Sequence, residues 1–136
     1  MSDTPLKDEP KTYPRPLSPH LQVYRLPMTA LMSITHRMTG VALAAGCVLI
    51  TAFLVTAAID EELFEAVRDF SITHVGTAIL FAWSLALYYH LCNGIRHLIW
   101  DTVHLLDEKK AMAAGWVVLL AAAGLTAATW YFASIY

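Results

Sequence analysis

The sequence predicts an all-α membrane protein with three transmembrane helices. Of its 136 residues, 57% are hydrophobic and only 15% are charged, which departs strongly from the average soluble domain. No Asp, Glu, Lys or Arg occurs in the three stretches 38–59, 70–95 and 111–136. Each stretch exceeds the roughly 20 residues that a helix needs to cross about 30 Å of hydrocarbon. A soluble protein of this length would not need three such stretches to build a core.

The chain divides into an N-terminal segment and a membrane domain. The prolines of residues 1–19 predict an extended arm, and residues 20–27 are expected to lie along the headgroup region of the bilayer. Residues 1–27 therefore form the N-terminal segment, and residues 28–136 form the anchor domain. Its spans are expected at about 30–59, 71–101 and 111–134. A short acidic connection, with about one helical turn, joins the first two spans.

The basic residues predict that the N-terminus faces the cytoplasm. They gather before the first span and between the second and the third, as Lys7, Lys11, Arg15, Arg25, Arg37, Arg96, Lys109 and Lys110. The connection at residues 60–69 contains one basic residue, Arg68, and is otherwise rich in acidic side chains. Because short cytoplasmic loops are enriched in Lys and Arg, this connection and the C-terminus are expected on the opposite side.

The N-terminal residues favour a bacterial inner membrane over a mitochondrial one. The first long apolar stretch begins only after about residue 37, so we expect no N-terminal signal peptide. Residues 1–12 include Asp3, Asp8 and Glu9, whereas mitochondrial transit sequences are poor in acidic residues. The expected surroundings are a lipid bilayer and other subunits, and nothing in the composition indicates nucleic-acid binding.

The second span contains a histidine, His90, at a depth where ionisable side chains are costly and often functional. His97 lies seven residues later and Gly94 four residues later, so all three share a helix face. A glycine one turn from an imidazole leaves a flat gap, which suits a porphyrin beside its axial ligand. The alternative is a histidine that is hydrogen-bonded to another helix, with Gly94 serving helix packing.

The first span begins with a polar face that is expected to lie at the same membrane level. Ser33, His36, Arg37 and Gly40 follow the spacing i, i+3, i+4 and i+7. In an antiparallel pair, Arg37 meets the level of Arg96 and His97, and the resulting cationic cluster could hold haem propionates. Ser33 and Arg37 could also donate to a quinone carbonyl. The alternative is that the arginines extend along the helix ends toward the headgroups.

A count of the histidines predicts that a second axial ligand would come from another subunit. His74 is 16 residues, or roughly 24 Å, from His90 on the same helix, so the two cannot bind one iron. His36 is expected to be too shallow. One good axial ligand, His90, then remains in this chain.

Two longer motifs resemble a known family. They are Arg15-Pro16-Leu17 followed by Ser33-Ile34-Thr35-His36-Arg37-Met38-Thr39-Gly40, and His90-Leu91-Cys92-Asn93-Gly94-Ile95-Arg96-His97-Leu98-Ile99-Trp100-Asp101. Together with the three spans, they resemble the cytochrome b membrane-anchor subunit of succinate dehydrogenase over about residues 13–136.

This resemblance implies the large membrane anchor of respiratory complex II, part of a hetero-oligomeric haem-binding helix bundle. Its partners would be a flavoprotein subunit, an iron–sulfur subunit and a small membrane anchor. His90 would be the axial ligand of haem b, shared with a histidine of the small anchor. Ser33 and Arg37 would line the ubiquinone site, and His36, Arg37 and His97 would lie near the haem or its propionates.

The resemblance also implies a role in the tricarboxylic acid cycle and the respiratory chain. Electrons from succinate would pass through iron–sulfur clusters to ubiquinone, and this chain would position quinone and haem without oxidising succinate itself. Two alternatives stay open. One is the anchor of a fumarate reductase, and the other is a cofactor-free structural or proton-conducting subunit that uses the histidines as a proton relay.

Overall fold

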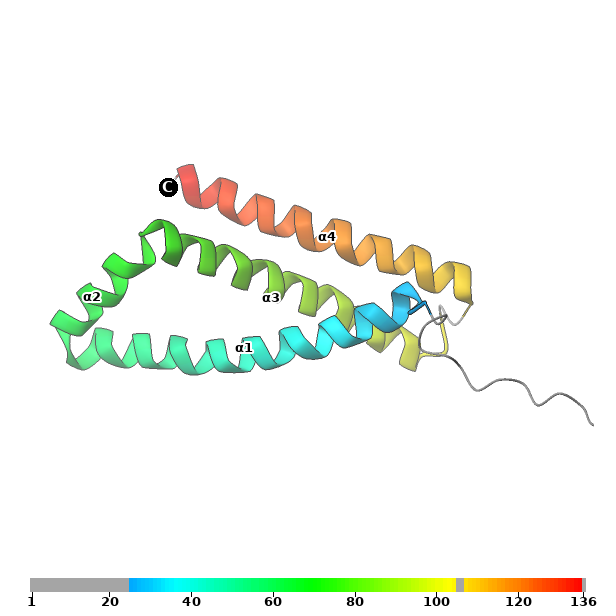
Figure 1. Ribbon diagram of the computed structural model, residues 1–136, viewed down its shortest axis with the longest axis horizontal. Helices are drawn as coiled ribbons and strands as arrows, with labels where there is room; N and C mark the ends of the chain where they lie inside the picture. The colour runs from blue at the N-terminus through cyan, green and yellow to red at the C-terminus, as the bar shows by residue number, and fades with distance from the viewer. Residues whose placement is uncertain (1–24, 105–106, 136) are drawn as a thin grey trace, which may run out of the picture.

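The computed structural model of the chain describes residues 25–104 and 107–135, which form four α-helices without any strand. They are α1 (Met28–Ile59), α2 (Glu61–Ser71), α3 (His74–Asp101) and α4 (Glu108–Ile135). Three of them, α1, α3 and α4, are long and apolar enough to cross a membrane. Figure 1 shows these three long helices running alongside one another in alternating directions, with α2 across one end. The predicted all-α membrane fold with three spans is confirmed.

The helix α1 begins directly after Pro27. The fixed backbone of this proline is extended, with φ −63° and ψ 151°, and its carbonyl accepts hydrogen bonds from the backbone N–H groups of Ala30 and Leu31 at 3.0 and 3.2 Å. Proline suits a helix start because it has no N–H group that would need a partner there. The helix therefore starts two residues earlier than the expected span.

The acidic connection forms a complete helix, so the expectation of about one turn is wrong. The 11 residues of α2 follow Asp60, whose side-chain Oδ1 accepts a hydrogen bond from Leu63 N at 2.9 Å. This N-cap satisfies a backbone donor that would otherwise lack a partner. The Phe64 ring packs on Phe53 of α1 with 5.1 Å between the ring centroids. An N-cap and an apolar contact together are enough to extend the turn into a helix.

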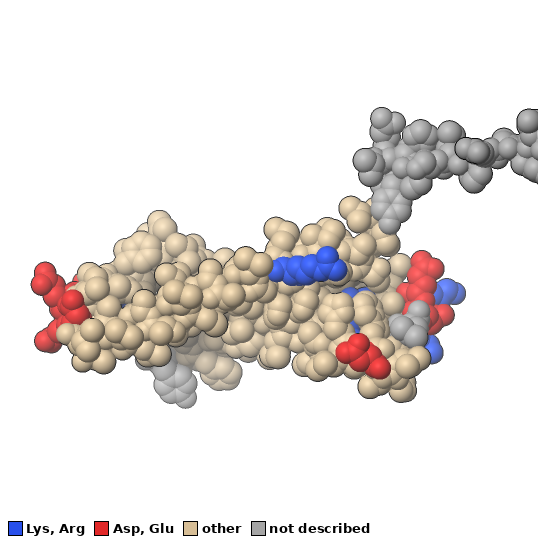
Figure 2. Space-filling view, turned by 90° about the horizontal axis from the view of Figure 1, so that it is seen from below, with Lys and Arg blue, Asp and Glu red and all other residues tan. Residues whose placement is uncertain are grey.

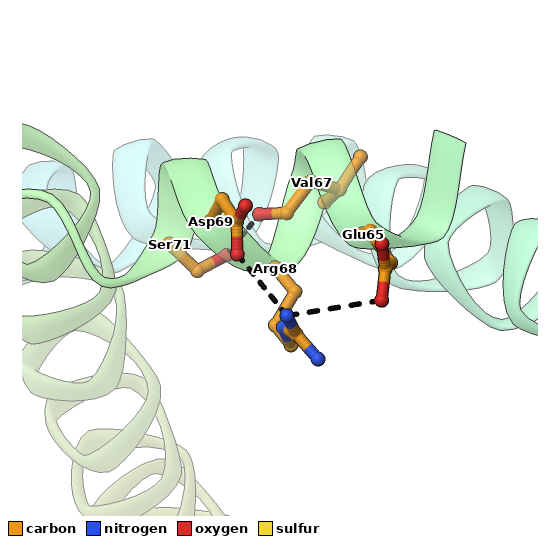
Figure 3. Close-up of polar contacts among 5 residues, drawn as sticks. All are labelled: Glu65, Val67, Arg68, Asp69 and Ser71. Carbon is orange, nitrogen blue, oxygen red and sulfur yellow. Dashed lines mark hydrogen bonds and ion pairs between the residues drawn. The ribbon is translucent and has the colours of Figure 1, made fainter. Parts of the chain in front are cut away.

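The charged side chains of α2 are exposed. Arg68 lies 4.0 Å from Glu65 and 3.3 Å from Asp69, and the Ser71 hydroxyl donates to the Val67 carbonyl (Figure 3). Exposed ion pairs of this kind contribute little to stability. Their position instead marks the surface that meets water, and Figure 2 shows acidic side chains at this end of the molecule.

The long helices pack most closely at the end where α1 starts, α3 ends and α4 starts (Figure 1). On α4, the buried residues form one stripe of small or slender side chains: Ala111, Gly115, Val118, Ala122 and Thr126. A Cβ added to Gly115 would lie 2.9 Å from the Met32 sulfur, so the glycine is what lets α1 approach. Small residues serve close helix packing in membranes in this way.

Most apolar side chains of the three spans point outward. Val41, Leu49 and Leu120 are more than 70% exposed, and the long tan surface in Figure 2 carries few charges between the two ends. An apolar surface of this extent is stable when lipid or other membrane subunits cover it. The protein is embedded in a membrane.

Candidate functional site

The His90 imidazole of α3 is held by the backbone of α1. Its Nδ1 lies 3.1 Å from the His36 carbonyl oxygen and 3.2 Å from the Thr39 hydroxyl oxygen. The Thr39 hydroxyl donates its own hydrogen to the His36 carbonyl at 2.8 Å. Both neighbours therefore accept from Nδ1, and the hydrogen-bond network assigns the ring proton to that nitrogen. The Nε2 lone pair, which has no hydrogen-bond partner among the described residues, is left for a ligand.

A glycine does lie against this imidazole, but it comes from the other helix. A Cβ added to Gly40 of α1 would be 3.0 Å from His90 Cε1, whereas one added to Gly94 would be 3.9 Å from His36 Cε1. Gly94 therefore faces His36, and Gly40 makes the close approach to His90. Any side chain at position 40 would press on the ring, so the glycine preserves the position of the imidazole.

The three histidines His36, His90 and His97 form one group, which we call the histidine cluster. The His36 and His90 rings are stacked, with centroids 3.9 Å apart and planes inclined by 10°, and His97 lies 5.2 Å from His36. The expectation that His36 is too shallow is wrong, because its ring reaches the depth of His90. The buried Nδ1 of His36 has no hydrogen-bond partner within the described chain.

The two predicted quinone residues, Ser33 and Arg37, lie at the same end of α1 as His36. Ser33 is half-buried and lies one turn before His36, and Arg37 is exposed. A hydroxyl and a guanidinium on consecutive turns can both donate hydrogen bonds to an oxygen atom of a ligand. The structure brings Ser33 near the histidine cluster along one helix, while Arg37 points to the outside of this chain.

Arg96 does not join the cationic cluster that the sequence predicted. It is only 2% exposed, and its guanidinium donates to Asn93 Oδ1 at 3.3 Å and to the Ala111 carbonyl at 3.0 Å. The same group lies over the Trp100 ring at 4.1 Å. Arg96 therefore does not reach the helix end toward the headgroups either. Six residues after His90, it lies about 240° around the helix and points toward α4.

Sequence reasoning missed two polar residues of α3 that hold the site together. The Tyr89 hydroxyl bonds the Thr35 hydroxyl at 2.6 Å and donates to the Met32 carbonyl at 3.0 Å. Asn93 is fully buried and donates to the same carbonyl at 3.4 Å. Their spacing could have revealed them, because Tyr89, Asn93 and Arg96 follow the spacing i, i+4 and i+7, which places three polar residues on one face of an apolar helix. This polar stripe fixes α3 against the start of α1.

Comparison with known protein families decides the identity. Residues 11–129 match the model of the family described as the succinate dehydrogenase/fumarate reductase transmembrane subunit. The chain belongs to this family. The matched residues contain α1, α3, the histidine cluster and most of α4, so the resemblance carried by the two motifs is confirmed.

Individual relatives in the succinate dehydrogenase/fumarate reductase family carry consistent names. The succinate dehydrogenase cytochrome b556 subunit of Paracoccus denitrificans is 46% identical over 111 residues, which is 77% of this chain and 85% of the relative. The subunit of the same name from Rickettsia felis is 37% identical over 116 residues, or 85% of this chain and 90% of the relative. The mitochondrial succinate dehydrogenase cytochrome b560 subunit of Dictyostelium discoideum is 38% identical over 128 residues, which is 88% of this chain and 62% of the relative.

Proposed function

We propose that this chain is the large membrane-anchor subunit of succinate dehydrogenase, that it binds haem b through His90, and that it forms part of the ubiquinone-reduction site. Its partners are the flavoprotein, the iron–sulfur subunit and a small membrane anchor. The enzyme lies in a bacterial inner membrane with the N-terminus of this chain in the cytoplasm. This chain takes no part in the oxidation of succinate.

One observation carries the haem proposal. His90 donates its Nδ1 proton to the His36 carbonyl and the Thr39 hydroxyl, and the unshared Nε2 lone pair is available to iron. Histidine ligands of metals almost always donate the other ring N–H in this way, which fixes the tautomer and orients the ring. The residues present therefore fit an axial ligand. When bound, haem supplies one-electron transfer.

The ring geometry supports the part of the proposal in which the second axial histidine comes from the small anchor. The two axial ligands of one iron bind on opposite faces of the porphyrin. The His36 ring instead lies parallel to the His90 ring at 3.9 Å between centroids, so a porphyrin cannot lie between their nitrogens. Within the described chain, His97 is the other nearby histidine, and it shares the α3 helix face with His90. These positions favour a second ligand from a partner subunit.

The quinone proposal rests on Ser33 and Arg37. The Ser33 hydroxyl and the Arg37 guanidinium are donors at one end of α1, and a quinone carbonyl accepts hydrogen bonds. Their role is to bind and orient ubiquinone, and the cationic group favours the negative charge that develops on the oxygen during reduction. The soluble subunits supply the electrons from succinate. Because Arg37 is exposed in this chain, it is free to face a partner or the quinone.

The test is a reduced-minus-oxidised spectrum of the whole purified complex. We expect His90→Ala to abolish the b-type haem signal while the soluble subunits still co-purify. His104→Ala is the matched control, because His104 is exposed and its ring bonds Thr102 outside the spans. An unchanged haem signal in His90→Ala would exclude His90 as the ligand. A wild-type complex without a Soret band would favour a cofactor-free proton-conducting subunit.

The anchor of a fumarate reductase is the second candidate, because the family description names both enzymes. The names of the relatives favour succinate dehydrogenase. The two are separated by comparing succinate–ubiquinone with menaquinol–fumarate activity in native membranes. We expect the first activity to dominate, and dominance of the second would favour fumarate reductase.

A further inference from the structure

An apolar groove runs between α3 and α4 and belongs to none of the site described above. It has a volume of about 530 Å³, within the range of ordinary ligand pockets. Its apolar sides are formed by Cys92, Ile95 and Ile99 of α3 and by Ala114, Val117 and Ala121 of α4. Two cationic residues, Arg96 and Lys110, are also part of the lining, at the end where α4 begins. The groove is therefore apolar along its length and positive at one end.

The groove faces away from the histidine cluster. Cys92 follows His90 by two residues and Ile99 follows His97 by two, and each step of two residues turns about 200° around a helix. A partner subunit that supplies the second haem ligand has to approach the face of His90. It would leave the groove, on the far side of α3, open to the bilayer.

The positive end lacks a compensating carboxylate. Neither Arg96 nor Lys110 takes part in an ion pair within the described chain, where both ion pairs involve Arg68. The guanidinium of Arg96 donates only to neutral groups, and its buried Nε has no partner among the described atoms. The nearby Asp107 carboxylate accepts from the backbone N–H groups of Lys109 and Lys110, and it forms no ion pair with either cation within the described chain. A buried unpaired cation is costly, and an anion close to it lowers that cost.

We propose that this groove binds an anionic glycerophospholipid, with one acyl chain along the apolar sides and the phosphate beside Lys110. An acyl chain suits the apolar sides of the groove between the two helices. A neutral lipid would leave the positive end uncompensated. Basic pockets between transmembrane helices on the cytoplasmic side bind anionic headgroups for this reason. The proposal rests on the proposed function only for the side from which the partner subunit approaches and for the cytoplasmic position of the positive end.

The experiment measures lipid binding to the complete purified complex after reconstitution in nanodiscs. Phosphatidylglycerol and phosphatidylcholine are the two probes, and bound lipid is counted by native mass spectrometry. We expect Lys110→Gln to weaken phosphatidylglycerol binding about fivefold and to leave phosphatidylcholine unchanged. Lys109→Gln is the matched control, because it removes the same charge one residue away from the groove lining, and we expect less than a twofold change.

A second pair of variants tests the apolar part of the groove. Ala121→Phe places a ring in the groove, whereas Ala123→Phe places one on the exposed side of α4. We expect only Ala121→Phe to reduce bound phosphatidylglycerol. Equal affinity of wild type and Lys110→Gln, or equal binding of both lipids, would overturn the proposal. Loss of the small anchor from the Ala121→Phe complex would also overturn it, because the groove would then be a subunit interface.

Discussion

His36 contacts His90 in two ways, through its backbone and through its side chain. Its carbonyl oxygen lies 3.1 Å from His90 Nδ1, and its imidazole ring stacks on the His90 ring with centroids 3.9 Å apart. The carbonyl contact survives any substitution of residue 36, whereas the ring contact does not. A variant such as His36→Ala therefore keeps the tautomer of His90 and removes only the ring that covers one of its faces.

The Thr39 hydroxyl is expected to strengthen the binding of haem without contacting it. Thr39→Val keeps the shape of the side chain but removes an acceptor from His90 Nδ1. Residues that orient a metal-ligating histidine typically contribute 10- to 100-fold in metal affinity. Because the His36 carbonyl remains, we expect about a tenfold weaker retention of haem, measured as haem per complex after detergent dilution. Thr39→Ser should restore retention, and an unchanged value for Thr39→Val would contradict this role.

Gly40→Ala is expected to displace the His90 imidazole. The added Cβ would lie 3.0 Å from Cε1, so the ring would have to move by a few tenths of an ångström. We expect less haem per complex. Gly124→Ala is the matched control, because a Cβ at that glycine meets nothing within 4 Å. The same haem content in both variants would show that the approach of Gly40 does not constrain the ring.

Substitution of the quinone residues should separate two activities of the complex. Ser33→Ala and Arg37→Ala each remove a donor from the proposed ubiquinone site. We expect succinate–ubiquinone activity to fall at least tenfold, while electron transfer from succinate to a soluble artificial acceptor is kept. If both activities fall together, the variants have disturbed assembly, and if neither falls, the residues do not bind quinone.

Asn93→Ala should destabilise the packing of α3 against α1. The fully buried Asn93 accepts from Arg96 and donates to the Met32 carbonyl. Removing it leaves a buried guanidinium with one partner fewer, which costs about 1–2 kcal/mol. The measurement is thermal inactivation of the complex, with Thr51→Ala as a control, since the exposed Thr51 hydroxyl bonds only within its own helix. In an Arg96→Met background, the same Asn93→Ala change should cost less.

The spans and the position of the key histidine could be predicted from the sequence because they follow from simple periodicities. Three uncharged stretches predict three spans by length alone. The spacing of His90, Gly94 and His97 predicts a shared face on one helix. Both inferences need only the rise and the turn of an α-helix, and they do not depend on how helices pack.

The contacts between helices could not be predicted in the same way. The stacking of His36 on His90 depends on the position of α1 along α3. Contacts between the two helices define that position, among them Gly46, where an added Cβ would overlap the Trp83 ring. Arg96 was expected among the cations because an antiparallel pair of helices places it at the level of Arg37 and His97. The Arg96 side chain points inward because its guanidinium donates a hydrogen bond to the Ala111 carbonyl of α4. Contacts of this kind join residues that are far apart in the sequence, so the periodicity of a single helix does not predict them.

The length of α2 also decides how the long helices are arranged. At about 1.5 Å per residue, its 11 residues extend roughly 16 Å, nearly twice the usual 8–10 Å between packed helix axes. Figure 1 shows α2 crossing from the end of α1 to the start of α3. The ribbons of α1 and α3 therefore diverge from the end near the histidine cluster toward the end that α2 crosses (Figure 1). Because the two helices diverge, they cover little of each other's apolar surface, and lipid or neighbouring subunits have to cover the rest.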